Sequence, residues 1–244
     1  MNALTFGRLR NFRRVDQWLL LLSIASSAAY LVTRAVQPFP GSGALKALSM
    51  APLALLAYRV LGAAERTGDG RVHRGDHLIL AAALALSCLG DVFLHLGPRR
   101  YFMHALGAFL VAHLAYTLLF TRHWPRPFRA GRGQMILTAL VLVYSLAVTS
   151  WLSSGLGPLA VPVLAYTCAI TAMTVAAILA GFSTPFVWIG ALLFVVSDSL
   201  IAAARFKAPL PLAVAFLIWP TYYLGQYGIA IGFLREKSGE DSRR

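Results

Sequence analysis

Two aspartates interrupt segments that are otherwise apolar. Asp91 lies within residues 87–94, and Asp198 lies within residues 194–199. An ionisable side chain inside an apolar membrane segment costs roughly 2.5–3.5 kcal/mol, so each aspartate indicates a functional site or a buried ion pair. Burial favours the protonated form of a carboxyl group, and a second carboxylate nearby strengthens this effect. One member of such a pair can therefore donate a proton while the other stays ionised.

A proton donor beside an ionised carboxylate suits a reaction that passes through an oxocarbenium-like state. A lipid vinyl ether is a substrate of this type. Protonation of its alkenyl carbon gives an oxocarbenium ion, water adds to that ion, and the resulting hemiacetal collapses to an aldehyde and an alcohol. The sequence shows no G-x-S-x-G nucleophile elbow and no convincing metal-ligand spacing, so we expect neither a metal nor a cofactor.

Other polar side chains lie at a similar depth in the apolar segments. His113 and Tyr116 are three residues apart, which places them on one face of a helix. Tyr222 and Gln226 are four residues apart, and Tyr223 and Gln226 are three apart, so a second helix carries hydroxyl and amide groups together. With the two aspartates, these residues predict one polar site near the middle of a membrane, built by four helices.

The composition indicates that the elements carrying this site are membrane helices. Of the 244 residues, 58% are hydrophobic and 13% are charged, and the mean hydropathy is +0.68. A soluble domain carries about twice that share of charged residues. Apolar runs of about 20 residues are long enough to cross a bilayer. We expect an all-α, polytopic bundle of about eight transmembrane helices, at residues 18–36, 44–63, 77–94, 101–120, 134–152, 159–181, 186–206 and 212–234.

The basic residues predict the orientation of this bundle. The net charge is +13, from 22 Lys and Arg against 9 Asp and Glu, and the excess lies in short loops and tails. Sixteen of the basic residues fall on the side of the two termini, which places both termini in the cytoplasm. We therefore expect membrane orientation rather than nucleic-acid binding as the role of this charge.

The predicted domain organisation follows from the spans. We expect a basic cytoplasmic tail at residues 1–15, a single transmembrane domain at 16–235 and a second cytoplasmic tail at 236–244. The protein is expected to be an integral, multi-pass protein of the plasma (inner) membrane. Association into a homodimer is left open.

The polar segments also carry short motifs in a fixed order. From about residue 46 to residue 232, their order and spacing resemble the YhhN family of multi-pass membrane proteins, whose characterised animal members are lysoplasmalogenases. The motifs are Gly90-Asp91-Val92-Phe93-Leu94, Phe109 through His113 with Tyr116, Gly190-Ala191-Leu192-Leu193-Phe194 followed by Ser197-Asp198-Ser199, and Tyr222-Tyr223-x-x-Gln226.

The resemblance implies hydrolysis of the vinyl ether bond of lysoplasmalogens, which gives a fatty aldehyde and glycerophospho-ethanolamine or -choline. The expected partner is thus a lysophospholipid, and Asp91 and Asp198 are the implied acid/base pair. Lys46 matches a basic position of the family and would hold the lipid phosphate as a point charge. The other residues expected to line the substrate site are His113, Tyr116, Tyr166, Ser197, Tyr222, Tyr223 and Gln226.

Two other interpretations use the same residues. Intramembrane Asp and His also mark ion paths, and residues 77–120 and 186–234 each carry an Asp followed by polar groups. Such a parallel repeat occurs in some transporters, so the alternative is a proton-coupled transporter of a small or lipid substrate. In the third interpretation, the polar groups only join helices.

Overall fold

Long apolar runs separated by short Pro- and Gly-containing connections determine the secondary structure of this chain. The computed structural model describes residues 14–66 and 74–239, which form eight α-helices. Two short 3-10 turns follow α1 and precede α6. The helices are α1 (Arg14–Val32), α2 (Ser42–Arg66), α3 (Arg74–Leu96), α4 (Phe102–Thr121), α5 (Arg132–Leu156), α6 (Ala160–Leu179), α7 (Phe186–Phe206) and α8 (Leu212–Gly239).

These helices confirm the predicted all-α membrane fold, with one helix at each predicted span. Six stretches of the described residues are long and apolar enough to cross a membrane, and one of them, Arg132–Leu179, contains both α5 and α6. The helix α8 is not among the six. Its middle carries Pro220, Tyr222, Tyr223 and Gln226, which are residues of the predicted site. Eight crossings and cytoplasmic termini stay predictions.

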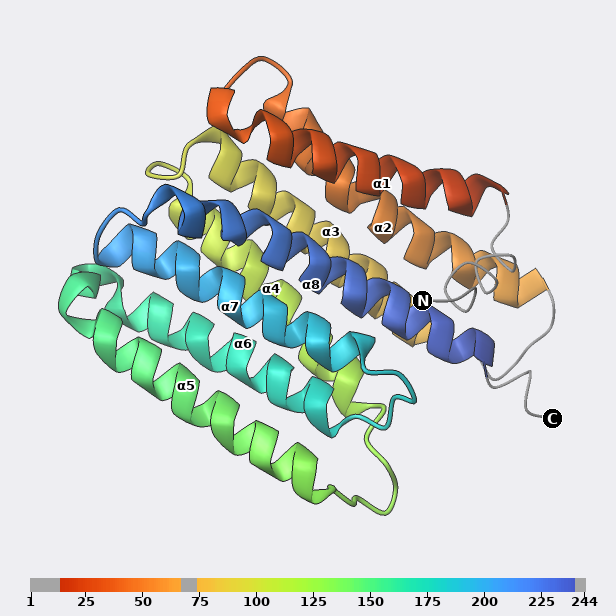
Figure 1. Cartoon of the computed structure of the whole chain (residues 1–244). Coiled ribbons are helices and arrows are strands. Elements are labelled where there is room, and N and C mark those ends of the chain that lie inside the picture. The colour runs from red at the N-terminus through yellow and green to blue at the C-terminus, as the bar shows by residue number, and fades with distance from the viewer. Residues whose placement is uncertain (1–13, 67–73, 240–244) are drawn as a thin grey trace.

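The two predicted tails fall almost wholly outside the described residues. Of the tail at 1–15, the last two residues begin α1, and the tail at 236–244 begins as the final turn of α8. The start of α1 and the end of α8 lie at the same end of the bundle (Figure 1). The two helices therefore reach the predicted tails on the same side of the protein.

The helices form one bundle with α1 and α5 at opposite edges (Figure 1). Packing follows the chain from α1 to α4, since α2 lies against both α1 and α3, and α3 lies against α4. The second half joins through α6, which packs on α4, α5 and α7, and through α8, which packs on α7 and also contacts α1 and α2. The polar residues of α2, α3, α4, α6, α7 and α8 consequently meet in the interior.

Glycines bring α7 and α8 into close contact. A Cβ atom added to Gly190 would lie 2.6 Å from the carbonyl oxygen of Gly225, and one added to Gly225 would lie 2.8 Å from the carbonyl oxygen of Gly190. Small residues of this kind allow helix backbones to meet directly in membrane proteins. This glycine seam fixes the position of Asp198 on α7 relative to Tyr222 on α8.

A further glycine positions an aromatic ring at the centre of the bundle. A Cβ atom added to Gly90 on α3 would lie 2.6 Å from the ring of Phe109 on α4. The same ring makes edge-to-face contacts with Phe194 and with Tyr222, at centroid distances of 6.3 and 6.0 Å. Phe109 therefore lies between α3, α7 and α8, beside the aspartate that follows Gly90.

Candidate active site

Asp91 is held by a cation and a phenol, one on each carboxylate oxygen. The Nζ atom of Lys46, from α2, lies 2.9 Å from Oδ1. The hydroxyl of Tyr222, from α8, donates to Oδ2 at 2.6 Å. Only 2% of Asp91 and 9% of Lys46 is exposed. The charge of Asp91 is thus balanced within the bundle, and both of its oxygens have partners.

Neighbouring contacts hold Lys46 and Tyr222 in this arrangement. The Nζ atom of Lys46 lies 5.7 Å from the ring centroid of Trp219, one turn before Tyr222. The indole Nε1 of Trp219 donates to the hydroxyl of Ser27 on α1 at 3.0 Å. The hydroxyl of Ser197 donates to the carbonyl oxygen of Ile218 at 2.9 Å, which joins α7 to α8 next to Pro220. Contacts from α1, α7 and α8 therefore support the ion pair between α2 and α3.

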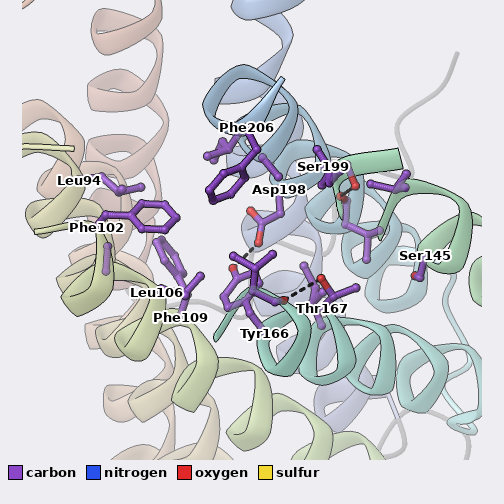
Figure 2. A pocket seen from close by; sticks show the side chains of 18 of the residues that line it. Leu94, Phe102, Leu106, Phe109, Ser145, Tyr166, Thr167, Asp198, Ser199 and Phe206 are labelled. Carbon is purple, nitrogen blue, oxygen red and sulfur yellow. Dashed lines mark hydrogen bonds between the residues drawn. The ribbon is translucent and has the colours of Figure 1, made fainter. Parts of the chain in front are cut away.

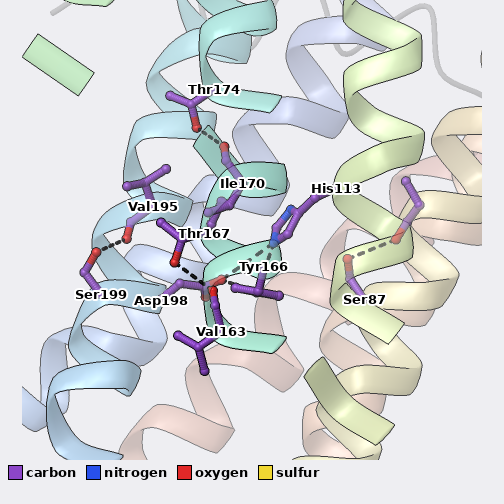
Figure 3. A network of polar contacts seen from close by, with 11 residues as sticks. Ser87, His113, Val163, Tyr166, Thr167, Ile170, Thr174, Val195, Asp198 and Ser199 are labelled. Carbon is purple, nitrogen blue, oxygen red and sulfur yellow. Dashed lines mark hydrogen bonds and ion pairs between the residues drawn. The ribbon is translucent and has the colours of Figure 1, made fainter. Parts of the chain in front are cut away.

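Asp198 has different partners, which come from α4 and α6. The hydroxyl of Tyr166 donates to Oδ2 of Asp198, and the Nε2 atom of His113 lies 3.0 Å from the Tyr166 oxygen and 3.7 Å from Oδ2 (Figure 3). Tyr166 has one hydroxyl proton, and it donates this proton to Asp198. The Nε2 atom of His113 must therefore be the donor to Tyr166. The Nδ1 atom of His113 is buried and has no hydrogen-bond partner among the described residues.

A third polar contact joins α4 to α8. The hydroxyl of Tyr116 donates to Oε1 of Gln226 at 2.7 Å, and both side chains are fully buried. The Nε2 atom of Gln226 is buried without a hydrogen-bond partner within residues 14–66 and 74–239. A buried donor without a partner is costly, and this amide lies beside Tyr222 of the Asp91 cluster.

Asp198 and Tyr166 open onto a largely apolar cavity with a volume of about 90 Å³. Figure 2 shows the two side chains facing each other, with Phe102, Leu106 and Phe109 on one side of them and Ser145 and Thr167 on the other. The remaining lining residues are Leu94, Ala105, Tyr144, Val148, Leu152, Val163, Ile170, Val195, Ser199, Ile201, Ala202 and Phe206. A carboxyl group at the wall of an apolar cavity can meet the apolar part of a lipid.

Comparison with known proteins assigns the chain to a family. The YhhN family matches residues 42–233, which include every residue of the two aspartate clusters. The chain belongs to the YhhN family.

Curated relatives of this YhhN protein carry enzyme names. The chain is 34% identical over 209 residues to a protein of Mycobacterium bovis named lysoplasmalogenase, which covers 84% of this chain and 78% of the relative. It is 35% identical over 161 residues to human lysoplasmalogenase TMEM86B, covering 64% of each chain. No solved structure matches the chain significantly. The family and the apolar helices make this an integral, multi-pass membrane protein.

The two aspartates of the YhhN motifs do not border the same cavity. Asp198 is among the lining residues and Asp91 is not. The rings of Phe109, Phe194 and Tyr222 contact one another between the two clusters. The structure therefore shows two adjoining clusters, where the sequence predicted one chamber shared by both carboxyls.

Half of the other predicted site residues join one of these clusters. Lys46 and Tyr222 surround Asp91, while His113 and Tyr166 surround Asp198. The hydroxyl of Tyr223 lies 2.9 Å from that of Ser23 on α1, so this side chain points away from the cavity. Ser197 and the Tyr116–Gln226 pair join helices beside the clusters.

Of the residues that line the cavity, Asp198 and Tyr166 were predicted as site residues and the others were not, among them Phe109, Tyr144 and Ser145. Phe109 belongs to one of the YhhN motifs, and its ring lies between the cavity and Tyr222. Tyr144 and Ser145 bring hydroxyls from α5. Two adjacent hydroxyl residues in an apolar helix could have indicated a site. Hydroxyls are also common in membrane helices as packing residues, so this pattern alone does not identify one.

Proposed function

We propose that this YhhN-family protein is a membrane hydrolase that cleaves the vinyl ether bond of lysoplasmalogens. The products are a fatty aldehyde and glycerophospho-ethanolamine or -choline. The observation that carries the proposal is the placement of Asp198, a carboxyl group that reaches an apolar cavity from a buried polar cluster. The lysoplasmalogenase names of the relatives support the same substrate.

In the proposed mechanism, Asp198 is the proton donor. Tyr166 occupies Oδ2 of Asp198, while Oδ1 has no hydrogen bond within the described residues and is the oxygen available to the substrate. A protonated Asp198 gives its proton to the alkenyl carbon, and the ether becomes an oxocarbenium ion. Water attacks the adjacent carbon and returns a proton to the Asp198 carboxylate. The hemiacetal then releases aldehyde and alcohol, so Asp198 acts first as acid and then as base.

Asp91 is the ionised member of the proposed pair. Lys46 and Tyr222 interact with both of its oxygens, which stabilises the carboxylate form. Its partner Tyr222 contacts the ring of Phe109, which lines the cavity together with Asp198. Such different surroundings suit two different roles, with Asp198 as the proton donor and Asp91 as a fixed negative charge.

His113 and Tyr166 are proposed as positioning residues for Asp198. The Nε2–H group of His113 donates to Tyr166, and Tyr166 donates to Asp198, so the chain of donors fixes the carboxyl plane. Precise placement of a proton donor relative to its acceptor is a large part of catalysis by general acids.

The proposal is tested with purified protein and a lysoplasmalogen, in H₂O and in D₂O. We expect aldehyde by mass spectrometry, with one deuterium on the carbon next to the carbonyl when the reaction runs in D₂O. The 1-O-alkyl analogue, which lacks the double bond, should give no product. Absence of aldehyde, or aldehyde without this deuterium, would contradict the mechanism.

The same preparation separates the enzyme from the transporter alternative. In proteoliposomes, a transporter would move labelled lysoplasmalogen and leave it intact. A hydrolase releases aldehyde both in detergent and in liposomes, since the reaction needs no closed compartment.

A further inference from the structure

One end of the bundle carries cations and no acidic residue. This is the end opposite the tails, formed by the connections 33–41, 97–101, 157–159 and 207–211 together with the adjoining helix ends. None of these connections contains Asp or Glu. The basic residues at this end, apart from Lys46 in the interior, are Arg34, Arg99, Arg100, Arg205 and Lys207.

Two of these cations lie next to residues that line the cavity, although neither is itself a lining residue. The guanidinium of Arg205 lies 4.8 Å from the ring centroid of Phe102, and Phe102 lines the cavity. Lys207 directly follows the lining residue Phe206, and its Nζ atom donates to the hydroxyl of Ser154 on α5 at 2.6 Å. Arg205 is exposed, and the described residues offer neither cation a carboxylate within ion-pair distance.

The spacing along α7 matches the length of a lysophospholipid. Arg205 follows Asp198 by seven residues, which is about two helical turns and about 10 Å along the same face. In a lysoplasmalogen, the phosphorus and the alkenyl carbon that accepts the proton are separated by roughly seven covalent bonds, a comparable length. When the phosphate binds Arg205, the vinyl ether therefore lies at the level of Asp198.

The cation first expected at the phosphate is engaged elsewhere. Lys46 is 9% exposed and its Nζ atom lies 2.9 Å from Asp91, so its charge is balanced inside the bundle. An arginine guanidinium suits a phosphate better than an ammonium group, because its planar fork donates two parallel hydrogen bonds.

We propose that Arg205, assisted by Lys207, binds the phosphate of the lysophospholipid at the mouth of the cavity. This assignment rests on the proposed function and specifies its substrate site. The headgroup lies at the acid-free end of the bundle, so the substrate comes from the leaflet at that end, with the vinyl ether beside Asp198.

The test measures equilibrium binding of a 1-O-hexadecyl lysophosphoethanolamine, an analogue that cannot be cleaved, to full-length protein in nanodiscs. We expect Arg205→Gln to weaken binding about tenfold, as the loss of a charge-assisted hydrogen bond would, and Lys207→Gln to weaken it less. Binding of 1-O-hexadecylglycerol, which has no phosphate, should stay unchanged in both variants. The matched controls Arg34→Gln and Arg99→Gln remove a cation from the same end and should bind both lipids normally.

Three results would overturn this assignment. The first is normal phospholipid binding by Arg205→Gln, and the second is an equal loss in Arg34→Gln, which would indicate a general surface charge effect. The third is inorganic phosphate binding as tightly as the lipid, which would indicate a site for the free anion. The analogue is not a substrate, so this experiment stays informative when cleavage fails. Binding that depends on Arg205 without any aldehyde release would contradict the proposed function alone.

Discussion

Asp91 and Asp198 are the same residue type on helices that run in the same direction, yet they are in opposite situations. Asp91 is bound on both oxygens by Lys46 and Tyr222 and does not border the cavity. The side chain of Asp198 is 13% exposed, contacts Tyr166 and His113, and lines the cavity. The contrast between the carboxyl that we propose as proton donor and the one that we propose as a fixed charge therefore lies in the number of partners and in the access to the cavity.

The largest effect is expected from Asp198→Asn, which removes the proposed proton donor and keeps the shape of the side chain. We expect the rate of aldehyde release to fall by about 10³-fold, within the range for loss of a general acid, with little change in thermal unfolding. Asp76→Asn is the matched control, since Asp76 is a buried aspartate paired with Arg122 away from the cavity. It should lose stability and keep its turnover. An active Asp198→Asn variant would remove the distinction between the two aspartates.

The second prediction concerns the stability that the ion pair between Lys46 and Asp91 provides. Lys46→Met leaves a buried carboxylate without its cation, so the free energy of unfolding should fall by about 3–5 kcal/mol. In the double variant Lys46→Met/Asp91→Asn, most of this loss should be recovered, as measured by unfolding in detergent. Equal instability of the single and double variants would show that the two charges do not stabilise each other.

A smaller effect is expected from Tyr166→Phe, which removes the hydroxyl between His113 and Asp198. Turnover should fall about tenfold, or about 1.4 kcal/mol, the equivalent of one buried hydrogen bond, while KM changes little. Activity at the level of the unmodified protein would show that Asp198 needs no positioning by Tyr166.

The smallest effect is expected from Tyr223→Phe, next to Tyr222 on α8. Its hydroxyl pairs with Ser23 on α1, so we expect a loss of about 1 kcal/mol in stability and a normal rate of aldehyde release. A rate loss as large as that of Tyr166→Phe would instead support the prediction that Tyr223 lines the substrate site.

The helices could be predicted because each is a long apolar run, and the length of such a run is set by the bilayer. The residue pattern also identified the polar faces of α4 and α8, and the bond between Tyr116 and Gln226 joins those two faces. Both predictions depend on local sequence alone.

The partners of each aspartate could not be predicted, since they depend on which helices are neighbours. Tyr223 and Tyr222 are adjacent in sequence, and the rotation of α8 decides that Tyr222 meets Asp91 while Tyr223 meets α1. The position of Phe109 likewise follows from the missing side chain of Gly90 on another helix. A lysine near the end of an apolar run has the same sequence pattern whether it binds a lipid headgroup or an internal carboxylate, as Lys46 illustrates.

The glycine seam between α7 and α8 has a mechanical consequence. Backbone atoms meet there without intervening side chains that could change rotamer, so neither helix can slide or tilt on the other without losing contact along its length. The pair therefore acts as a rigid frame for Asp198 and Tyr222. For the lipid substrate that we propose, entry to the cavity would then depend on another wall. The helix α5 is the candidate, since it lies at the edge of the bundle, packs on α6 and α7 and leaves most of its side chains outside the core.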